Sequence, residues 1–178
     1  MKTFRVTGLL ACMTLLGGCA SYAPLPTVSH VDLDRFMGDW YVIASIPTPF
    51  EHNIYNAVEN YQRIGPKKIQ TTFTYRKGGF EGAQKQMRPT GFVTDDPSNA
   101  VWGMQFIWPF KSDYRIVHLD PAYSETIIGR EKRDYVWIMA RQPQLADADY
   151  ARLVDIVRSI GYDTSQLKKV PQKWETAR

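Results

Sequence analysis

The stretch AVWGMQFIW at residues 100–108 decides the fold class, because its side chains alternate. Smaller residues separate the large apolar ones, which are Trp102, Met104, Phe106 and Trp108. Successive side chains of a β-strand point to opposite faces, so a period of two predicts a strand. The stretch YVWIMAR at residues 135–141 alternates in the same way and is also apolar on both faces. A strand of this kind needs cover on both sides.

Similar segments fill the chain on either side of this stretch, from Arg35 to Pro143. The eight candidate strands are Trp40–Ile46, Ala57–Ile64, Lys68–Tyr75, Lys85–Thr94, Ala100–Trp108, Tyr114–Leu119, Thr126–Gly129 and Tyr135–Arg141. Turn residues separate them, as at Gly78-Gly79. Eight strands at a spacing of about ten residues predict an all-β sandwich or barrel.

One amphipathic helix is expected after the strands, over Ala146–Ile160. Its apolar side recurs at helical spacing through Tyr150, Leu153, Val154, Val157 and Ile160. Asp147 is the expected N-cap and Gly161 the expected residue after the C-terminus. A lone helix of this kind fits against the outside of a barrel, where it covers an apolar outer face. No repeat and no second domain boundary is apparent.

The N-terminus has the layout of a secretory signal. Lys2 and Arg5 precede a run from Val6 to Gly18 that is mostly apolar and carries no charge. This run is too short to span a bilayer as a mature helix. The alternative is a buried N-terminal helix, which the two adjacent glycines and the lack of a polar face disfavour. We therefore expect residues 1–18 to be a cleaved signal peptide.

Residues 16–19, LGGC, resemble the lipobox of bacterial lipoproteins. The resemblance implies transfer of diacylglycerol to the sulfur of Cys19, cleavage before that residue and acylation of the new amine. Ala20 follows, where an Asp would mark retention in the inner membrane, so the resemblance favours the outer membrane. Residues 19–30 would then form a lipidated N-terminus and a short tether.

Processing changes the meaning of the composition. The whole chain has 178 residues, with 22 Lys and Arg against 18 Asp and Glu. Loss of Lys2 and Arg5 would leave 20 basic against 18 acidic side chains. Cys12 would leave with the signal and lipid would occupy Cys19, so no thiol would remain for a disulfide. The length suits one domain, and no basic stripe typical of a nucleic-acid binder is present.

Three motifs resemble those of the lipocalin family, and within it the bacterial lipoprotein lipocalins. They lie at residues 36–41 (FMGDWY, with Gly38 and Trp40), at residues 94–97 (TDDP, with Thr94 and Asp95) and at Arg141. The resemblance covers about residues 31–172. It implies an eight-stranded antiparallel up-and-down β-barrel with one C-terminal α-helix packed on the outside. The lipocalin domain would span residues 31–178.

These motif residues are expected to be structural. Gly38 would allow a sharp turn into the first strand. Trp40 would plug the closed end of the barrel, with the guanidinium of Arg141 across its indole ring. We do not expect either residue to bind ligand.

The family pattern, combined with the period of two, predicts which side chains point into the barrel. The expected ligand-binding residues are Phe73, Tyr61, Trp102, Met104, Phe106, Tyr114, Ile116, His118, Ile128, Tyr135 and Trp137. A lumen lined by such residues suits an elongated apolar molecule, although each of them also suits plain packing. Tyr61, Tyr114 and His118 are either contacts for a polar head group or hydrogen-bonded core residues. Glu59 precedes Tyr61 by two residues, so its side chain should point to the same face of the sheet. An inward carboxylate would repel a fatty-acid carboxylate and favour an amine-bearing lipid, unless Glu59 lies at the solvated rim.

The expected function is that of a membrane-anchored lipocalin, held by acylated Cys19 in the outer membrane and facing the periplasm. It would bind a fatty acid, a lysophospholipid or a similar lipid for storage, transport or membrane maintenance. No cofactor, metal or nucleic acid is expected, and the protein would be a monomer or homodimer. The alternatives are a structural lipoprotein with a filled barrel, or a lipid-active enzyme. The sequence contains no G-x-S-x-G or H-E-x-x-H motif, which disfavours the common hydrolases.

Overall fold

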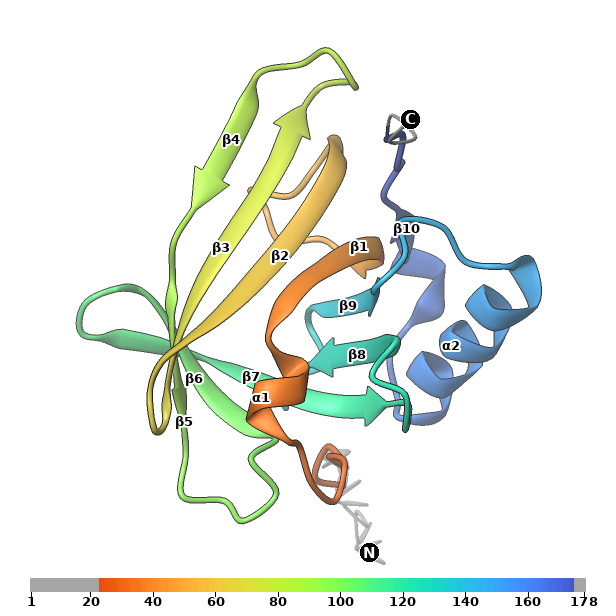
Figure 1. Cartoon of the computed structure of the whole chain (residues 1–178). Coiled ribbons are helices and arrows are strands. Elements are labelled where there is room, and N and C mark those ends of the chain that lie inside the picture. The colour runs from red at the N-terminus through yellow and green to blue at the C-terminus, as the bar shows by residue number, and fades with distance from the viewer. Residues whose placement is uncertain (1–22, 175–178) are drawn as a thin grey trace, which may run out of the picture.

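The computed structural model describes residues 23–174 of the chain (Figure 1). The expected signal peptide, Cys19 and the first part of the tether lie outside the described residues. No helix in the described part is long and apolar enough to cross a membrane.

Ten strands form one antiparallel sheet, and nine of them make a barrel that closes through the pairing of the first strand with the ninth. The strands of the barrel are β1 (Gly38–Ile46), β2 (Ile54–Gly65), β3 (Lys68–Lys77), β4 (Gln84–Met87), β5 (Thr90–Val93), β6 (Val101–Ile107), β7 (Phe110–Leu119), β8 (Glu125–Gly129) and β9 (Val136–Ala140). Both β4 and β5 pair with β3, and together they make one side of the barrel. The result is a closed eight-stranded antiparallel barrel, which confirms the predicted fold class.

The expected strand Lys85–Thr94 is interrupted, and the interruption has a chemical cause. β4 ends at Met87 and β5 begins at Thr90, with Arg88 and Pro89 between them. Proline has no backbone N–H to donate to the neighbouring strand, so it marks breaks and edges in sheets. A second difference is at β7, which begins at Phe110 rather than Tyr114 and forms a long hairpin with β6.

The barrel has a closed end and an open end. A four-residue helix that the alternation did not predict, α1 (Leu33–Phe36), precedes β1 at the closed end, with Asp32 accepting hydrogen bonds at its N-cap. β1 and β6 run away from this end, and β8 runs in the same direction. The open end is therefore bordered by the β1–β2, β3–β4, β6–β7 and β8–β9 connections.

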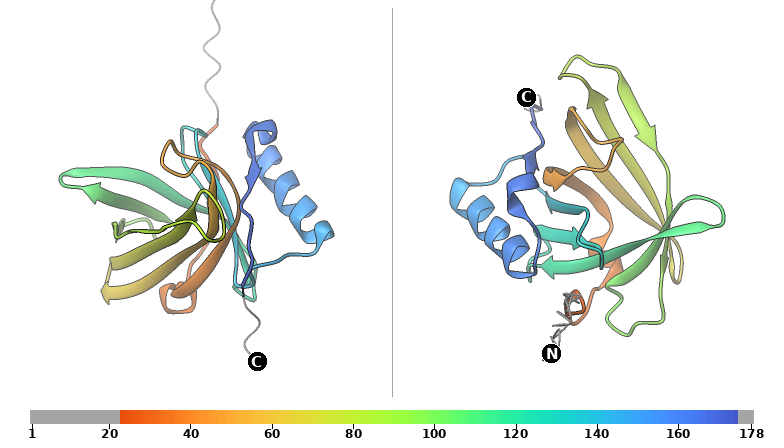
Figure 2. Two further views of the ribbon diagram at one scale, coloured as in Figure 1. Left: turned by 90° about the horizontal axis from the view of Figure 1, so that it is seen from above. Right: turned by 180° about the vertical axis from the view of Figure 1, so that it is seen from behind.

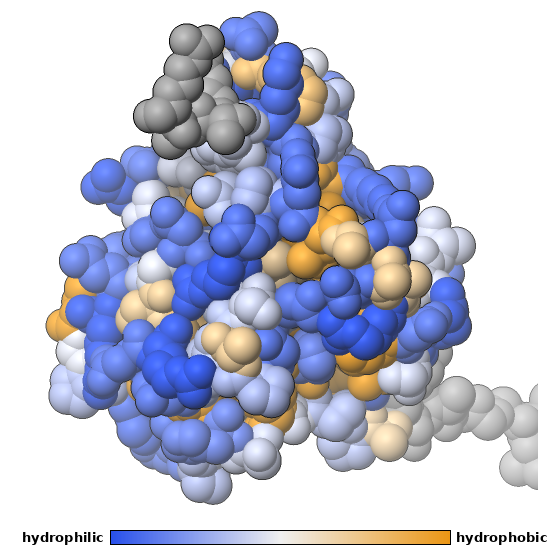
Figure 3. All heavy atoms as spheres, turned by 45° about the vertical axis from the view of Figure 1, so that its right-hand side comes forward, coloured by the Kyte–Doolittle hydropathy of each residue, from blue (hydrophilic) through white to orange (hydrophobic). Residues whose placement is uncertain are grey.

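Helix α2 (Asp147–Ser159) packs on the outside of the barrel, as expected (Figures 1 and 2). Leu153 and Val157 are fully buried against the outward side chains of β1, β8 and β9. Its N-cap is Ala146, which makes no side-chain hydrogen bond, so Asp147 is the first helical residue and not the cap. Gly161 has a φ of +93° directly after the helix, which is the predicted ending. Seen from the side of α2, most of the surface is hydrophilic (Figure 3).

The C-terminal segment fills a gap that the strand pattern did not predict. β1 pairs with β2 only over Gly38–Tyr41, and the two strands separate beyond that point. A short 3-10 helix, η1 (Thr164–Gln166), leads into β10 (Lys168–Lys169), which pairs with β1 at Ala44 and Ser45. The chain thereby completes the hydrogen bonding of β1 where β2 has departed.

The apolar residues form two separate cores. One lies inside the barrel and includes Trp40 and Trp102. The other lies between the outer face of the sheet and α2, and includes Ile127 and Ile138. This arrangement explains why β8 and β9 are apolar on both faces.

Candidate ligand-binding cavity

The closed end of the barrel is packed with aromatic rings. Trp40 is fully buried and donates from Nε1 to the carbonyl oxygen of Phe36 at 2.9 Å. The centre of the Phe36 ring lies 5.1 Å from that of Trp40 and 5.6 Å from that of Trp102. The guanidinium carbon of Arg141 lies 3.9 Å from the centre of a Trp40 ring. These contacts leave no open passage for a ligand at this end.

Arg141 also fixes the backbone around α1. It donates to the carbonyl oxygens of Asp39 at 2.7 Å and Met37 at 2.8 Å. Gly38 has a φ of +94°, and a Cβ there would lie 3.4 Å from the guanidinium of Arg141. Glycine is therefore the natural residue at this turn.

The TDDP motif is a turn at the same end. Thr94 donates to the carbonyl oxygen of Val101 at 2.9 Å, and Asp95 forms an ion pair of 2.6 Å with Lys67. Asp95 is exposed to solvent, so both residues of this motif lie apart from the barrel interior.

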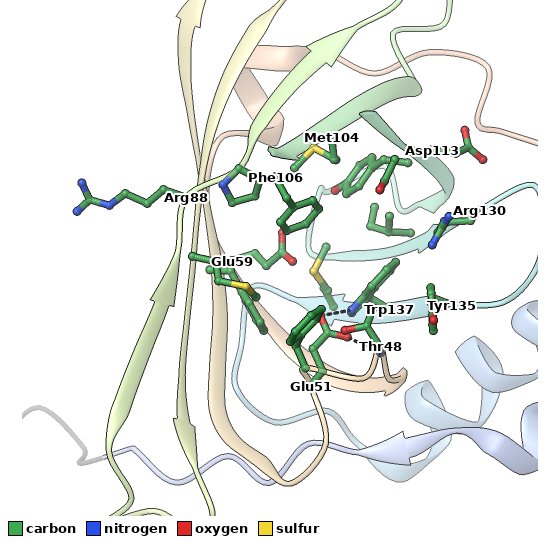
Figure 4. A pocket seen from close by; sticks show the side chains of 18 of the residues that line it. Thr48, Glu51, Glu59, Arg88, Met104, Phe106, Asp113, Arg130, Tyr135 and Trp137 are labelled. Atoms are coloured by element: carbon green, nitrogen blue, oxygen red, sulfur yellow. Dashed lines mark hydrogen bonds between the residues drawn. The ribbon is translucent and has the colours of Figure 1, made fainter. Parts of the chain in front are cut away.

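A cavity of about 640 Å³ occupies the open half of the barrel (Figure 4). Eight of the predicted ligand-binding residues line it, namely Phe73, Tyr61, Met104, Phe106, Tyr114, Ile128, Tyr135 and Trp137. The remaining lining comes mainly from the β1–β2 loop, the break between β4 and β5, and the rim of β7. Its volume lies in the range that small-molecule sites occupy, about 300–1,000 Å³.

Three predicted residues do not line the cavity. Trp102 is stacked on Tyr114 with ring centres 5.1 Å apart and belongs to the closed-end packing. Ile116 is fully buried in the same interior core. His118 lies on the opposite face of the sheet, as described next.

A β-bulge reverses the expected direction of His118. The register of β7 against β8 shifts between Ile116 and His118, so that His118 faces Ile127. Directly opposed residues point to the same face, and Ile127 belongs to the core under α2. Burial lowers the pKa of His118, and the positive charge of nearby Arg152 on α2 lowers it further. The extra residue of a bulge breaks the period of two on which the prediction depended.

A hydrogen-bonded chain of polar groups crosses the inner part of the cavity. Tyr114 and Tyr61 are joined through their hydroxyl groups at 2.7 Å, and the hydroxyl of Tyr61 donates to the carboxyl group of Glu59. Burial raises the pKa of Glu59 to about 7, although the hydrogen bond from Tyr61 lowers it. Glu59 therefore lies within the barrel, with its carboxyl group directed into the cavity (Figure 4).

A second buried carboxyl group, Glu51, lies nearer to the mouth. It accepts hydrogen bonds from the backbone N–H of Thr48 at 2.9 Å and from the indole N–H of Trp137 at 3.2 Å. Burial raises the pKa of Glu51, and the negative charge of Glu51 in turn raises that of Glu59. Strand alternation could not have found Glu51, because this residue lies in a loop.

The geometry suits binding more than catalysis. The walls are mostly apolar, and the polar groups are few and convergent, as in sites for small apolar ligands. Within the described residues, no group of three or more His, Cys, Asp or Glu side chains is placed to hold a metal ion.

Comparisons with known proteins agree with the fold. Residues 31–172 match the family model described as a lipocalin-like domain. The outer membrane lipoprotein Blc of Citrobacter freundii is 26% identical, over 97% of this chain and 98% of that protein. A putative lipocalin of Acanthamoeba polyphaga mimivirus is 32% identical, over 78% of this chain and 83% of that protein.

Among solved structures, lobster apocrustacyanin A1 superposes with a TM-score of 0.64 at 13% identity. The match covers 85% of this chain and 92% of that one, and at this identity it supports the fold alone. The family match spans most of the chain, includes all three sequence motifs and agrees with the closed barrel. The chain therefore belongs to the lipocalin family.

Proposed function

We propose that this protein binds one acyl chain of a fatty acid, lysophospholipid or similar lipid in the barrel, and that it works at the outer membrane. The observation that carries the proposal is the apolar cavity that is closed by Trp40 at one end and open at the other. Lipocalins typically bind small apolar molecules and are not typically enzymes. The size of the cavity favours this function over a structural lipoprotein with a filled barrel.

The free energy of burial is sufficient for useful affinity. A chain with about 14 methylene groups gains roughly 11 kcal/mol at about 0.8 kcal/mol for each group. Loss of ligand motion and desolvation of the head group reduce this gain, which leaves binding of about micromolar strength.

The proposed location depends on Cys19 and on the relatives. The lipobox resemblance implies an acyl anchor, and the relatives named Blc are described as outer membrane lipoproteins. In cells, Cys19→Ala should release the protein from the membrane fraction and abolish labelling by a fatty acid. Persistent acyl labelling of that variant would exclude Cys19 as the lipidation site.

The binding proposal is tested on protein purified from its own membrane. Native mass spectrometry should detect a bound acyl lipid, and a fluorescent fatty acid should bind the delipidated protein and be displaced by palmitate. If no lipid co-purifies and no fluorescent probe binds, the proposed lipid binding is refuted and the filled-barrel alternative is favoured. A lipase and esterase assay on the same sample tests the enzyme alternative.

A further inference from the structure

Large apolar side chains are exposed at the open end of the barrel. Five of them are 57–81% exposed: Phe50, Phe106, Ile107, Trp108 and Phe110. Among the described residues, two other large apolar side chains are exposed to a comparable extent, Ile64 at 49% and Trp174 at 43%, and Ile64 lies at the closed end. Contiguous exposed apolar groups commonly mark interaction sites.

These five residues, which we call the apolar rim, come from two loops that border the cavity. Phe50 lies in the β1–β2 connection, and the other four form the end of the β6–β7 hairpin. This hairpin projects well beyond the neighbouring strands (Figures 1 and 2). Phe50, Phe106 and Ile107 also line the cavity, so the apolar surface continues from the rim into the barrel.

The first described residues of the N-terminal segment lie at the same end of the barrel. The guanidinium of Arg133 donates to the carbonyl oxygen of Ala23 at 2.8 Å, and the N–H of Leu25 donates to the carboxylate of Glu131 at 3.1 Å. Both partners lie in the β8–β9 connection at the open end. Leu25 is buried against the outer face of the sheet, and a Cβ at Gly129 would lie 3.1 Å from it.

This attachment limits where the proposed anchor can be. Cys19 precedes Leu25 by six residues, which reach at most about 20 Å when fully extended. Acyl chains on Cys19 would therefore enter the membrane near the open end and not near the closed end.

We propose that the apolar rim docks on a phospholipid bilayer, with Trp108 and Phe110 inserted and the cavity opening toward the acyl layer. The proposal rests on the proposed function, because it takes an acyl lipid as the ligand and Cys19 as the anchor. A bilayer fits better than a protein partner because four of the five apolar groups lie at the end of one projecting hairpin, which suits insertion, and because the anchor would hold this end near the membrane.

The test uses the mature chain with Cys19→Ala, so that vesicle binding does not depend on the anchor. The vesicles contain phosphatidylethanolamine and phosphatidylglycerol, and binding is measured by co-sedimentation. The double variant Trp108→Ser, Phe110→Ser should bind at least tenfold more weakly, since two exposed aromatic groups no longer leave water. Ile64→Ser, which removes an exposed apolar side chain at the closed end, should bind like the parent.

The fluorescence of Trp108 also measures how deeply this residue enters the bilayer. Brominated lipids should quench tryptophan fluorescence in the parent chain, and Trp108→Phe should retain binding but lose most of this quenching. Equal vesicle binding by the double variant and by Ile64→Ser would overturn the proposal. A double variant that changes only the oligomeric state, with vesicle binding unchanged, would overturn it in favour of a contact between two copies.

Failure of docking is distinguishable from failure of lipid binding. Trp108 and Phe110 do not line the cavity, so the double variant should still bind the fluorescent fatty acid with the affinity of the parent. Loss of vesicle binding with probe binding intact supports docking as a separate function. Normal vesicle binding by a parent chain that binds no fatty acid would refute the proposed ligand and leave docking standing.

Discussion

Glu59 places a titratable carboxyl group in the buried interior of the barrel, so that folding and protonation are linked. Burial raises its pKa from 4.5 to about 7, and Tyr61 and Glu51 are the titratable groups that act on it. When the pKa of an acid is higher in the folded state than in the unfolded state, protonation of that acid stabilises the fold. This contribution is fully present at pH values below the pKa of the unfolded state. This contribution is lost as the pH rises from 4.5 through 7.

The prediction is that the free energy of unfolding decreases between pH 5 and pH 8, and that Glu59→Gln removes most of this decrease. Gln keeps an acceptor for Tyr61 but cannot ionise, so the variant should be more stable than the parent at pH 8 by up to about 3 kcal/mol. Urea unfolding at the two pH values measures the difference. Glu81→Gln, at an exposed site, is the control, and a pH dependence unchanged by Glu59→Gln would contradict the prediction.

Trp40 and Arg141 give the second prediction at this scale. Trp40→Ala removes a fully buried indole and the surface on which Arg141 lies. We expect unfolding to become easier by about 3–5 kcal/mol, as for other large aromatic truncations. Trp174→Ala, which truncates a 43% exposed indole, should have a much smaller effect in the same urea titration. Similar losses for both variants would mean that Trp40 is not the plug.

Single residues also show how far sequence reasoning reaches. Eight side chains that the family pattern and a period of two direct into the barrel line the cavity, among them Tyr61, Phe73 and Trp137. The alternation failed at His118, where a bulge reverses the faces. It also placed Trp102 in the cavity lining. Alternation predicts that this side chain points into the barrel, but it does not predict how far along the barrel axis the side chain lies. The alternation could not predict Glu51, because this residue lies in a loop, where side chains follow no period.

At the scale of elements, the segment after α2 replaces a missing strand partner. Gln172 donates from Nε2 to the carbonyl oxygens of Val42 on β1, at 2.8 Å, and Ala57 on β2, at 3.1 Å. Val170 and Asn56 add backbone hydrogen bonds on either side. The segment thus bridges two strands that have separated. A strand of two residues is too short to show an alternating pattern and has no capping residue, so β10 was not predictable from the sequence.

The third prediction concerns this bridge. Gln172→Ala leaves two partly buried carbonyl oxygens without their donor, which should lower the free energy of unfolding by about 1–3 kcal/mol. Gln166→Ala is the control, because the side-chain amide of Gln166 bonds only to nearby Asp163. Urea unfolding measures both. Equal stability of the two variants would show that the side chain of Gln172 does not hold β1 and β2 together.

At the scale of the whole molecule, stability and binding space come from different parts of the barrel. Trp40 at the closed end and Leu153 and Val157 under α2 are fully buried, whereas the cavity lies in the open half. Filling the cavity should therefore abolish binding without unfolding the protein. Ser112 is suited to this purpose because it lines the cavity on β7 and has a small side chain. A Trp at this position is compatible with a strand and would occupy the cavity.

The fourth prediction is a linkage between binding and stability. At a free ligand concentration of 100 times Kd, the parent protein should gain about 2.7 kcal/mol in its free energy of unfolding, because ligand binds the folded state alone. Ser112→Trp should unfold cooperatively but gain nothing from the same ligand. Gln62→Trp, which adds the same indole on the exposed face of β2, should gain as much as the parent. Urea titrations with and without palmitate measure all three, and equal gains for the parent and Ser112→Trp would place the ligand outside the barrel.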